Sequence, residues 1–406
     1  MKPVREAAVS PNDPAAGAAA AAHARTRLWV ERLILTGFRN YAALALELGP
    51  EPVVLAGANG SGKTNLIEAV SLLAPGQGLR RAPFPDLARA GGDGSWSVAA
   101  RMHTALGAVD IGTGITGSTG NGERSGRIVR IDGEPQSGSG ALADYVEMVW
   151  LTPASDGLFT GPASERRRFL DRLILCFDAA HAKLSGRFER AMQSRNRLLS
   201  DGVREAARFD GLERIMAESG TAIAAARNEA ITALSGVIGQ RRSREPDSPF
   251  PWCRIMVEGT LERDLMTSPA VDVEEAYVRT LAGARERDRA AGRTLDGPHR
   301  SDLVAGHGPK SMPAHLCSTG EQKALLLGLV LAHAELIASR QEGLSPILLL
   351  DEVTAHLDAH RREALFAELL HLGCKAWLTG TDSIAFAPLE GYARLFEVED
   401  GKVMRR

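Results

Sequence analysis

The sequence predicts an α/β protein in which a parallel-sheet domain is interrupted by an inserted helical lobe. A Gly-rich run at residues 57–64 lies between a short buried strand and a helix. Four consecutive aliphatic residues, 347–350, end in two acidic residues near the other end of the chain. Residues 163–292 have the apolar spacing of long helices, so a separate lobe is expected between the two motifs.

The 406 residues divide into four predicted segments. Residues 1–26 are rich in Ala and Pro, and we expect a disordered extension rather than a signal peptide. The other segments are an N-terminal part of the α/β domain at 27–162, an arm lobe at 163–292 and a C-terminal part at 293–406.

The N-terminal part is expected to consist mainly of strands. The predicted strands are 28–30, 33–35, 44–48, 51–56, a hairpin meander within 95–131, and 146–151. A turn at 37–41 and a Gly/Ser loop at 136–140 separate some of them, and one helix is expected at 64–73.

Helices dominate the arm lobe, and buried strands return after residue 295. Arm helices are expected at 187–192 and 212–238, with a polar, Pro-containing break at 241–251. The elements expected in the C-terminal part are helices at 320–339 and 361–372 and strands at 347–350, 374–378 and 395–398.

Composition limits the class of protein. Hydrophobic residues make up 44% and charged residues 24%, as in soluble globular proteins, and the net charge of -2 does not by itself indicate a nucleic-acid binder. The cysteines are far apart and form no CxxC pair, which predicts reduced thiols in a cytoplasmic protein rather than zinc; they are Cys176, Cys253, Cys317 and Cys374. The sequence contains no run of eighteen or more apolar residues, so no membrane span is predicted.

Residues 57–64 match the phosphate-binding pattern GxxxxGK[ST]. Glycines let successive backbone N–H groups face a phosphate, and the following helix N-terminus adds partial positive charge. The residues are Gly57, Ala58, Asn59, Gly60, Ser61, Gly62, Lys63 and Thr64. We expect Lys63 to reach the β- and γ-phosphates of ATP and the Thr64 hydroxyl to ligate Mg²⁺. The alternative is a chance Gly-rich turn.

The acidic pair is expected to complete this site. Asp351, at the carboxyl end of a buried strand, is placed to hold Mg²⁺. Glu352 is expected to point to the other side of the strand, where it can orient and deprotonate the attacking water. The alternative is a solvated acidic turn. Residues 351–358 resemble the Walker B and D-loop run of ABC ATPases, which implies that Asp358 lies near a dimer interface.

A second helix start resembles the signature loop of ABC-type ATPases. It consists of Ser318, Thr319, Gly320, Glu321 and Gln322. A hydroxyl and backbone N–H groups at a helix N-terminus make an anion site, which in an ABC dimer closes on the γ-phosphate of the other subunit. Taken alone, the run is better explained as a plain capping box. Both Walker motifs in the right order favour the signature interpretation instead.

Two ABC features have no clear counterpart. No His follows residues 377–382, where ABC transporters carry a switch histidine, so Thr381 or Asp382 is the candidate substitute. Gln77 and the region 150–153 are alternative counterparts of the Q-loop.

Basic side chains gather in two places that suit DNA phosphates. Arg80 and Arg81 follow the first helix, and in residues 161–200 nine basic residues outnumber four acidic ones, a local net charge of +5. The nine are Arg166, Arg167, Arg168, Arg172, Lys183, Arg187, Arg190, Arg195 and Arg197. The alternative is a solvated or salt-bridged helix surface.

Five motifs in order resemble those of the RecF family of bacterial DNA replication and repair proteins. They are GFRNY at 37–41, GANGSGKTN at 57–65, GQGLRRAPF at 76–84, RRRFLD at 166–171 and GPHRSDL at 297–303. Residues 153–156, PASD, depart from the family's Pro-acidic pattern. The resemblance covers the chain from about residue 28 onward and implies a P-loop NTPase fold: an ABC/SMC-type ATPase head with an inserted α-helical arm lobe.

The resemblance also implies a function. It implies an ATP-dependent homodimer on single-stranded or gapped DNA, with slow, DNA-stimulated ATP hydrolysis as a conformational switch. The implied partners are RecR, with RecO and RecA in the same pathway, and the implied role is RecA loading and support of the SOS response. Arg39 and Asn40 are similar to residues that flank the nucleotide in related heads.

Two other functions fit the Walker motifs. The energising subunit of a membrane transporter would normally carry the switch histidine, which this chain lacks, and would not carry the arm insertion. A nucleotide-binding scaffold without turnover would not need Glu352.

Overall fold

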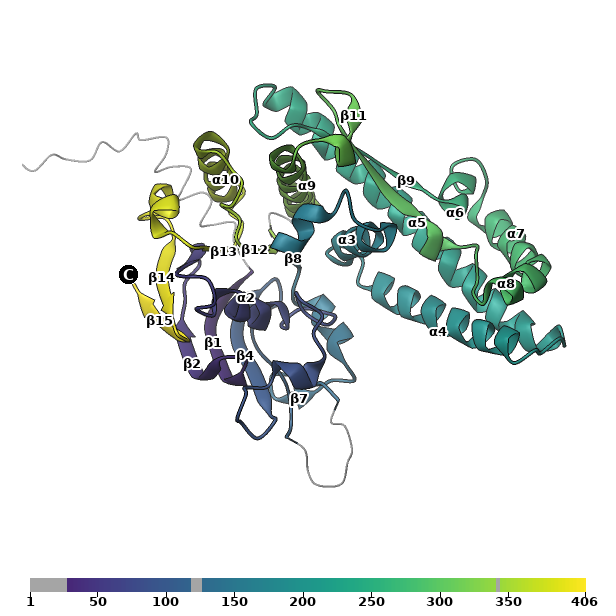
Figure 1. Cartoon of the computed structure of the whole chain (residues 1–406), viewed down its shortest axis with the longest axis horizontal. Coiled ribbons are helices and arrows are strands. Elements are labelled where there is room, and N and C mark those ends of the chain that lie inside the picture. Colours follow the sequence, from purple (N-terminus) through teal and green to yellow (C-terminus); the bar gives the residue numbers. More distant parts are fainter. Residues whose placement is uncertain (1–27, 118–125, 341–343) are drawn as a thin grey trace, which may run out of the picture.

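The computed structural model describes residues 28–117, 126–340 and 344–406. The extension expected at 1–26 lies outside the described residues. The α/β prediction is confirmed: Figure 1 shows a head built around sheets and a helical arm that extends from one side of it.

The first sheet of the head is antiparallel, with the order β2-β1-β4-β5-β6-β7. Its strands are β1 (Trp29–Phe38), β2 (Tyr41–Glu47), β4 (Trp96–Thr104), β5 (Gly107–Ile115), β6 (Ile128–Ile131) and β7 (Glu134–Pro135). The two strands predicted at 28–30 and 33–35 are one strand, because only a register shift between Val30 and Arg32 interrupts its pairing with β4. The predicted hairpin meander is confirmed.

The central sheet has the order β15-β14-β3-β13-β12-β8 and is parallel except for its edge strand β15. Its strands are β3 (Val53–Ala56), β8 (Met148–Leu151), β12 (Ile347–Leu350), β13 (Ala376–Gly380), β14 (Arg394–Glu399) and β15 (Lys402–Arg405). Every residue of β3, β8, β12 and β13 is buried, as expected for parallel strands covered on both faces.

Two hydrophobic cores cover the faces of the central sheet. Because successive side chains alternate, Val53 and Leu55 pack toward the first sheet and helix α2 (Lys63–Ser71), whereas Val54 packs toward α9 (Thr319–Arg340) and α10 (Ala359–His371). Figure 1 shows α2 on one side of the central strands and α9 and α10 on the other. This arrangement places α2 directly after the carboxyl end of β3.

Helix α9 is the most apolar helix of the head. Within the described ranges, it alone is long and apolar enough to cross a membrane, but 78% of its apolar stretch is buried inside the protein. It is therefore a core helix, as the prediction for 320–339 implied.

The arm contains six described helices, so the prediction of a helical lobe is largely confirmed. They are α3 (Ala163–Leu175), α4 (Ala180–Ser200), α5 (Ala207–Arg244), α6 (Thr260–Asp264), α7 (Ala270–Gly283) and α8 (Arg285–Ala291).

The described residues also form short 3₁₀ turns. These are η1 (Phe84–Leu87), η2 (Ser139–Asp144), η3 (Pro153–Gly157), η4 (Pro298–Arg300), η5 (Ala314–Leu316) and η6 (Ser383–Leu389).

A small sheet that was not predicted joins the arm to the head. Strand β9 (Cys253–Glu258) pairs antiparallel with β10 (Asp302–His307), which also pairs with β11 (Met312–Pro313). The boundary predicted between residues 292 and 293 therefore falls between two paired strands. The prediction missed β9 because it is short and its only partners lie beyond that boundary.

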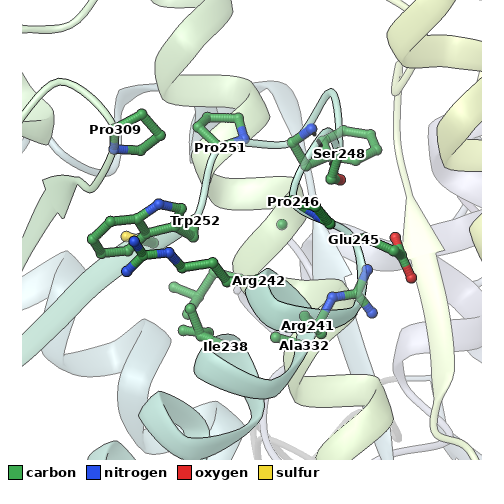
Figure 2. Close-up of a pocket in the computed structure, with 14 residues that line it drawn as sticks. Ile238, Arg241, Arg242, Glu245, Pro246, Ser248, Pro251, Trp252, Pro309 and Ala332 are labelled. Atoms are coloured by element: carbon green, nitrogen blue, oxygen red, sulfur yellow. Dashed lines mark hydrogen bonds between the residues drawn. The ribbon is translucent and has the colours of Figure 1, made fainter.

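The predicted break at 241–251 begins later than expected, because α5 continues to Arg244, and this end of α5 reaches the head. Arg241 forms ion pairs with Glu335 of α9 at 2.8 Å and with Glu368 of α10 at 2.6 Å. Arg242 lies over the ring of Trp252, 4.4 Å from its centroid, and Figure 2 shows the two side chains face to face. The last turn of α5 is thus held by α9, by α10 and by Trp252, which directly precedes β9.

Two of the sequence motifs, 166–171 and 297–303, interlock at the base of the arm. Arg166 donates two hydrogen bonds to the Asp302 carboxylate, at 2.7 and 2.8 Å, and Arg167 donates to the Ser301 carbonyl at 2.6 Å. Asp171 pairs with Arg227 of α5, which also donates to the Pro298 carbonyl. These motifs are a structural joint between α3, α5 and η4.

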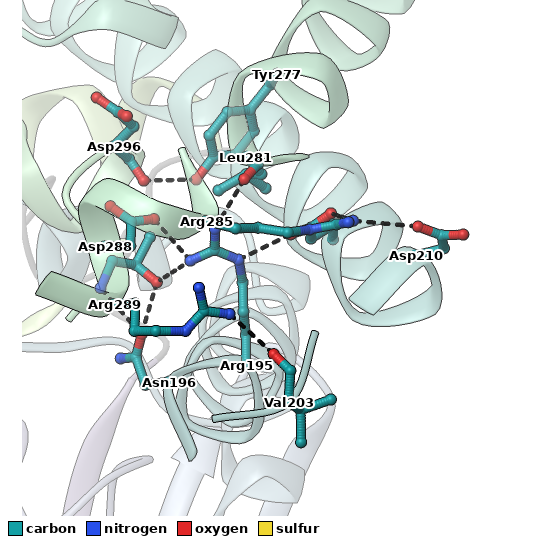
Figure 3. A network of polar contacts seen from close by, with 12 residues as sticks. Arg195, Asn196, Val203, Asp210, Tyr277, Leu281, Arg285, Asp288, Arg289 and Asp296 are labelled. Atoms are coloured by element: carbon teal, nitrogen blue, oxygen red, sulfur yellow. Dashed lines mark hydrogen bonds and ion pairs between the residues drawn. The ribbon is translucent and has the colours of Figure 1, made fainter. Parts of the chain in front are cut away.

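The basic strip predicted at 161–200 divides into enclosed and exposed side chains. Arg195 is completely buried and donates to Glu213 at 3.0 Å, to Asp288 at 2.8 Å and to the Leu281 carbonyl (Figure 3). Arg172 lies on the ring of Trp150, 3.3 Å from its centroid, and burial lowers its pKa to about 9. The interpretation of Arg172 and Arg195 as phosphate contacts is wrong because both are enclosed by segments distant in sequence. The other members of the strip include five exposed residues, for which contact with DNA stays a prediction: Arg168, Lys183, Arg187, Arg190 and Arg197.

Candidate nucleotide site

The phosphate loop connects β3 to α2, as predicted. Gly57, Gly60 and Gly62 have φ values of 154°, 83° and 116°, which side chains rarely adopt. A Cβ at Gly57 would lie 2.2 Å from the Val398 carbonyl oxygen, and one at Gly62 would lie 2.5 Å from Asn40 Nδ2. The loop therefore requires glycine at both positions for backbone conformation, and at Gly57, where the neighbour is backbone, also for space.

Lys63 folds back over the loop from the first turn of α2. Its Nζ donates to the carbonyls of Gly57 at 2.8 Å and Ala58 at 2.9 Å, and it lies 3.5 Å from Glu352 Oε1. Ser61 Oγ, in the same loop, is buried without a hydrogen-bond partner among the described residues. An unsatisfied buried hydroxyl beside a buried ammonium is what an anion-binding loop leaves for its ligand.

A small open hollow lies in front of the loop. Its lining residues are Asn59, Gly60, Gly62, Lys63, Thr64, Asn65, Arg80 and Glu352. Ala58, Asn59 and Gly60 are exposed at its edge. The predicted phosphate loop thus shares one hollow with Glu352, which lies 289 positions beyond Lys63 in the sequence.

Thr64 and Asp351 are brought together by the sheet. Thr64 Oγ1 donates to Asp351 Oδ1 at 3.0 Å, across 287 residues of sequence. A third residue, Thr379 on β13, also donates to Asp351 Oδ1, at 2.7 Å, and is completely buried. The sequence did not single out Thr379, because only the pairing of β12 with β13 places it beside Asp351.

These residues fit a Mg²⁺ ion. Magnesium prefers hard oxygen ligands and binds through one or two carboxylates together with water and phosphate oxygens. The Thr64 hydroxyl and the Asp351 carboxylate supply such a pair. Among the described residues there is no group of three His, Cys, Asp or Glu side chains that could hold a metal.

Glu352 lies on the phosphate-loop side, which corrects the prediction that it points to the other side of the strand. Strand β12 ends at Leu350, and Glu352 has a left-handed φ of 50° that turns its carboxylate toward Lys63. That conformation costs roughly 1–2 kcal/mol for a residue with a Cβ. The Glu352 N–H donates to Thr379 Oγ1 at 2.7 Å and helps to hold the turn.

The predicted signature residues form the start of α9. Ser318 is exposed, and its N–H and hydroxyl both donate to Glu321 Oε2 at 3.0 Å, as in a capping box. Hydrogen bonds from Lys310 and from Ser318 lower the Glu321 pKa to about 2. Thr319 is exposed and Gly320 partly exposed, whereas Gln322 is buried and donates to the Cys317 carbonyl at 2.8 Å. The exposed face of this turn therefore consists of residues 318–320.

The remaining predicted residues take different places. Asp358 is exposed and caps α10 by accepting a hydrogen bond from the Arg361 N–H at 2.8 Å. Asn40 lies against the phosphate loop, with Nδ2 3.3 Å from the Ser61 carbonyl oxygen. Arg39 instead binds Glu68 of α2, at 2.9 and 3.0 Å, so its guanidinium supports the helix. Asp382 caps η6 rather than facing the loop.

Comparison with known proteins agrees with this geometry. A family model described as RecF/RecN/SMC N terminal domain matches residues 29–376. A curated protein of Mesorhizobium japonicum named DNA replication and repair protein RecF is 55% identical over 375 residues, covering 92% of this chain and 97% of the relative. The chain belongs to the RecF family of DNA replication and repair proteins. A RecF of Brucella suis is 52% identical and covers 93% of this chain and 96% of its own length.

Solved structures show that the fold is that of RecF and of SMC heads. A structure described as the recombination mediator protein RecF with ATPrS in the RecFOR pathway has a TM-score of 0.79 at 21% identity, covering 94% of this chain and 98% of its own. The RecF–ATP structure has a TM-score of 0.77. A Smc head domain from Pyrococcus furiosus has a TM-score of 0.52 at 17% identity.

Proposed function

We propose that this chain is an ATP-dependent DNA-binding protein of recombinational repair and replication that acts as a homodimeric ATPase switch. One observation carries the proposal: Lys63, Thr64 and Glu352 line one hollow and Asp351 accepts a hydrogen bond from Thr64, although the two pairs of residues are far apart in sequence. Family membership supports the proposal. Two similar RecF structures, described as RecF–ATP and RecF–ATPrS, support it as well.

ATP is the ligand that suits the hollow. Its phosphates fit against the backbone N–H groups of residues 58–64 and the N-terminus of α2. Lys63 would exchange its contacts with the loop carbonyls for phosphate oxygens, and Thr64 and Asp351 would hold Mg²⁺, which supplies charge neutralisation when bound. Glu352, whose carboxylate lies 3.5 Å from Lys63 Nζ, would orient and deprotonate the attacking water.

The second half of each site is proposed to come from the other subunit. Residues 318–320 present a hydroxyl and helix N–H groups on an exposed turn, which suits the γ-phosphate of ATP bound by the partner. Asp358, also exposed, is proposed to lie at the same dimer interface. ATP binding would close the two heads on single-stranded or gapped DNA, and hydrolysis would open them.

The family supports a place for this switch in the cell. We propose a cytoplasmic protein that acts with RecR, and with RecO, to help load RecA at gaps and to support the SOS response. The description of a similar RecF structure as a recombination mediator in the RecFOR pathway supports this assignment.

The first test is ATP turnover by the purified protein, alone and with gapped duplex DNA, with Lys63→Ala as the blank. We expect slow turnover that gapped DNA stimulates and that the Lys63→Ala variant lacks. Turnover indifferent to DNA would contradict the DNA-gated switch, and ATP binding without any turnover would indicate a scaffold.

The dimer has its own test. Glu352→Gln removes the general base but keeps the side-chain shape, so ATP should bind and remain uncleaved. Light scattering is then expected to show a stable dimer with ATP and a monomer without it. A monomeric Glu352→Gln protein in saturating ATP would exclude the two-subunit site.

A further inference from the structure

We propose that Lys323 is a positioning residue that couples the signature turn of each subunit to the catalytic glutamate of that same subunit. This inference rests on the proposed function and adds a connection between the two ATP sites of the dimer. The sequence motifs did not include Lys323, which follows the signature run directly.

Lys323 joins three segments of the head. It lies in the second turn of α9, and its side chain is 6% exposed. Its Nζ donates to the carbonyl oxygen of Glu352 at 3.2 Å and lies 3.4 Å from Asp156 Oδ2 in η3. A buried ammonium requires such partners, so the side chain is fixed in this position.

The Glu352 peptide is consequently held from both sides. Its N–H donates to Thr379 and its carbonyl accepts from Lys323. Backbone in the left-handed region persists only where surrounding contacts enforce it. The direction of the Glu352 carboxylate therefore depends on the position of Lys323 and, through it, on the position of α9.

The start of α9 also lies close to the residues that follow Glu352. A Cβ on Gly320 would be 3.6 Å from the His356 carbonyl oxygen, and His356 has a left-handed φ of 62°. A shift of the signature turn therefore acts on the run from Glu352 to His356 at two points.

In the proposed dimer this geometry links the two sites. The signature turn of one subunit contacts ATP on its partner, while Lys323 on the same helix holds Glu352 at the subunit's own ATP. Closure on the partner's γ-phosphate would thus set the orientation of the glutamate in the other site. The expected consequence is that the two sites hydrolyse ATP cooperatively.

The test compares Lys323→Met, which keeps length and apolar volume but removes the ammonium, with wild type. We expect kcat to fall at least 10-fold and the Hill coefficient for ATP to fall from above 1 to 1. The Kd for N-methylanthraniloyl-ATP should stay within two-fold, and ATP-dependent dimers should remain visible by light scattering. Lys323→Arg, which retains charge and donors, is expected to keep at least a third of the wild-type kcat.

Thermal unfolding checks that each variant is folded, and Lys323→Gln replaces Lys323→Met if the latter does not fold. Wild-type kcat and Hill coefficient in either folded neutral variant would overturn the coupling, as would a non-cooperative wild type. A wild type that neither binds the ATP analogue nor dimerises would instead overturn the proposed function.

Discussion

Two polar clusters in this protein contain the same kinds of side chain but are organised differently. In the arm, Arg195 is enclosed by Glu213, Asp288, Thr294 and the Leu281 carbonyl, and each contact is made within the arm or its base. In the head, Lys63 binds carbonyls of its own loop beside an open hollow, and Ser61 Oγ has no partner among the described residues. A closed network indicates a structural role, whereas an incomplete one facing solvent indicates a ligand site.

The largest expected effect tests the closed cluster. Arg195→Met leaves Glu213 and Asp288 buried without their shared cation, which should lower the free energy of unfolding by about 3–5 kcal/mol. Urea denaturation measures this loss, and the Kd for ATP of the folded fraction should be unchanged. A loss below about 1 kcal/mol would contradict the structural role of the cluster.

The open cluster should respond in the opposite way. Lys63→Ala is expected to weaken ATP binding at least 100-fold, which corresponds to about 2.7 kcal/mol, because the phosphates lose their buried cation. The free energy of unfolding without ATP should change by less than about 1 kcal/mol. Fluorescence titration with an ATP analogue and urea denaturation separate the two quantities. Equal losses in both would mean that Lys63 is mainly structural.

A buried histidine gives the stability of the head a pH dependence. Burial lowers the pKa of His333 from 6.5 to about 4, and its Nε2 lies 2.9 Å from the Leu173 carbonyl oxygen. Between these values the unfolded chain binds a proton and the folded one does not, so stability falls as pH falls from 6.5 toward 4. The loss at pH 5 is expected to be about 2 kcal/mol.

Denaturation curves at pH 7 and pH 5 measure this difference. His333→Gln keeps a donor for the Leu173 carbonyl but cannot titrate, so its stability should change less between the two pH values. An equal pH dependence in the variant would assign the effect to other groups.

The smallest effect is expected at the arm surface. Arg187 donates two hydrogen bonds of 2.8 Å to the Glu218 carboxylate, but the two side chains are 43% and 54% exposed. Arg187→Gln should change the free energy of unfolding by less than about 1 kcal/mol, and the difference should shrink in high salt. A loss as large as that of Arg195→Met would remove the distinction between surface and interior in the arm.

Contiguous motifs located the phosphate loop and the acidic pair, and single residues from distant segments were missed. The phosphate loop and the residues after β12 could be located because each is a short run with a fixed chemical pattern. Thr379 and Lys323 could not, since only strand pairing and helix packing place them beside Asp351 and Glu352.

The enclosed members of the basic strip, Arg172 and Arg195, were interpreted wrongly for the same physical reason. The partners of Arg195 lie 18, 93 and 99 residues away in sequence, so local charge counting could not detect its neutralisation. The long helices α5 and α9 and the fully apolar strands were located because their pattern is local, whereas β9 depends on a partner 44 or more positions further along the chain.

The contact between Thr64 and Asp351 also has a consequence for synthesis of the protein. The 287 residues that separate them must be translated before the two side chains can meet, which takes on the order of 15–60 s at bacterial elongation rates. The loop receives its last neighbours still later, because the Gly401 N–H donates to the Ser61 carbonyl. During that interval the nascent head exposes an incomplete sheet on the ribosome. The complete set of contacts around the phosphate loop therefore forms only near the end of translation.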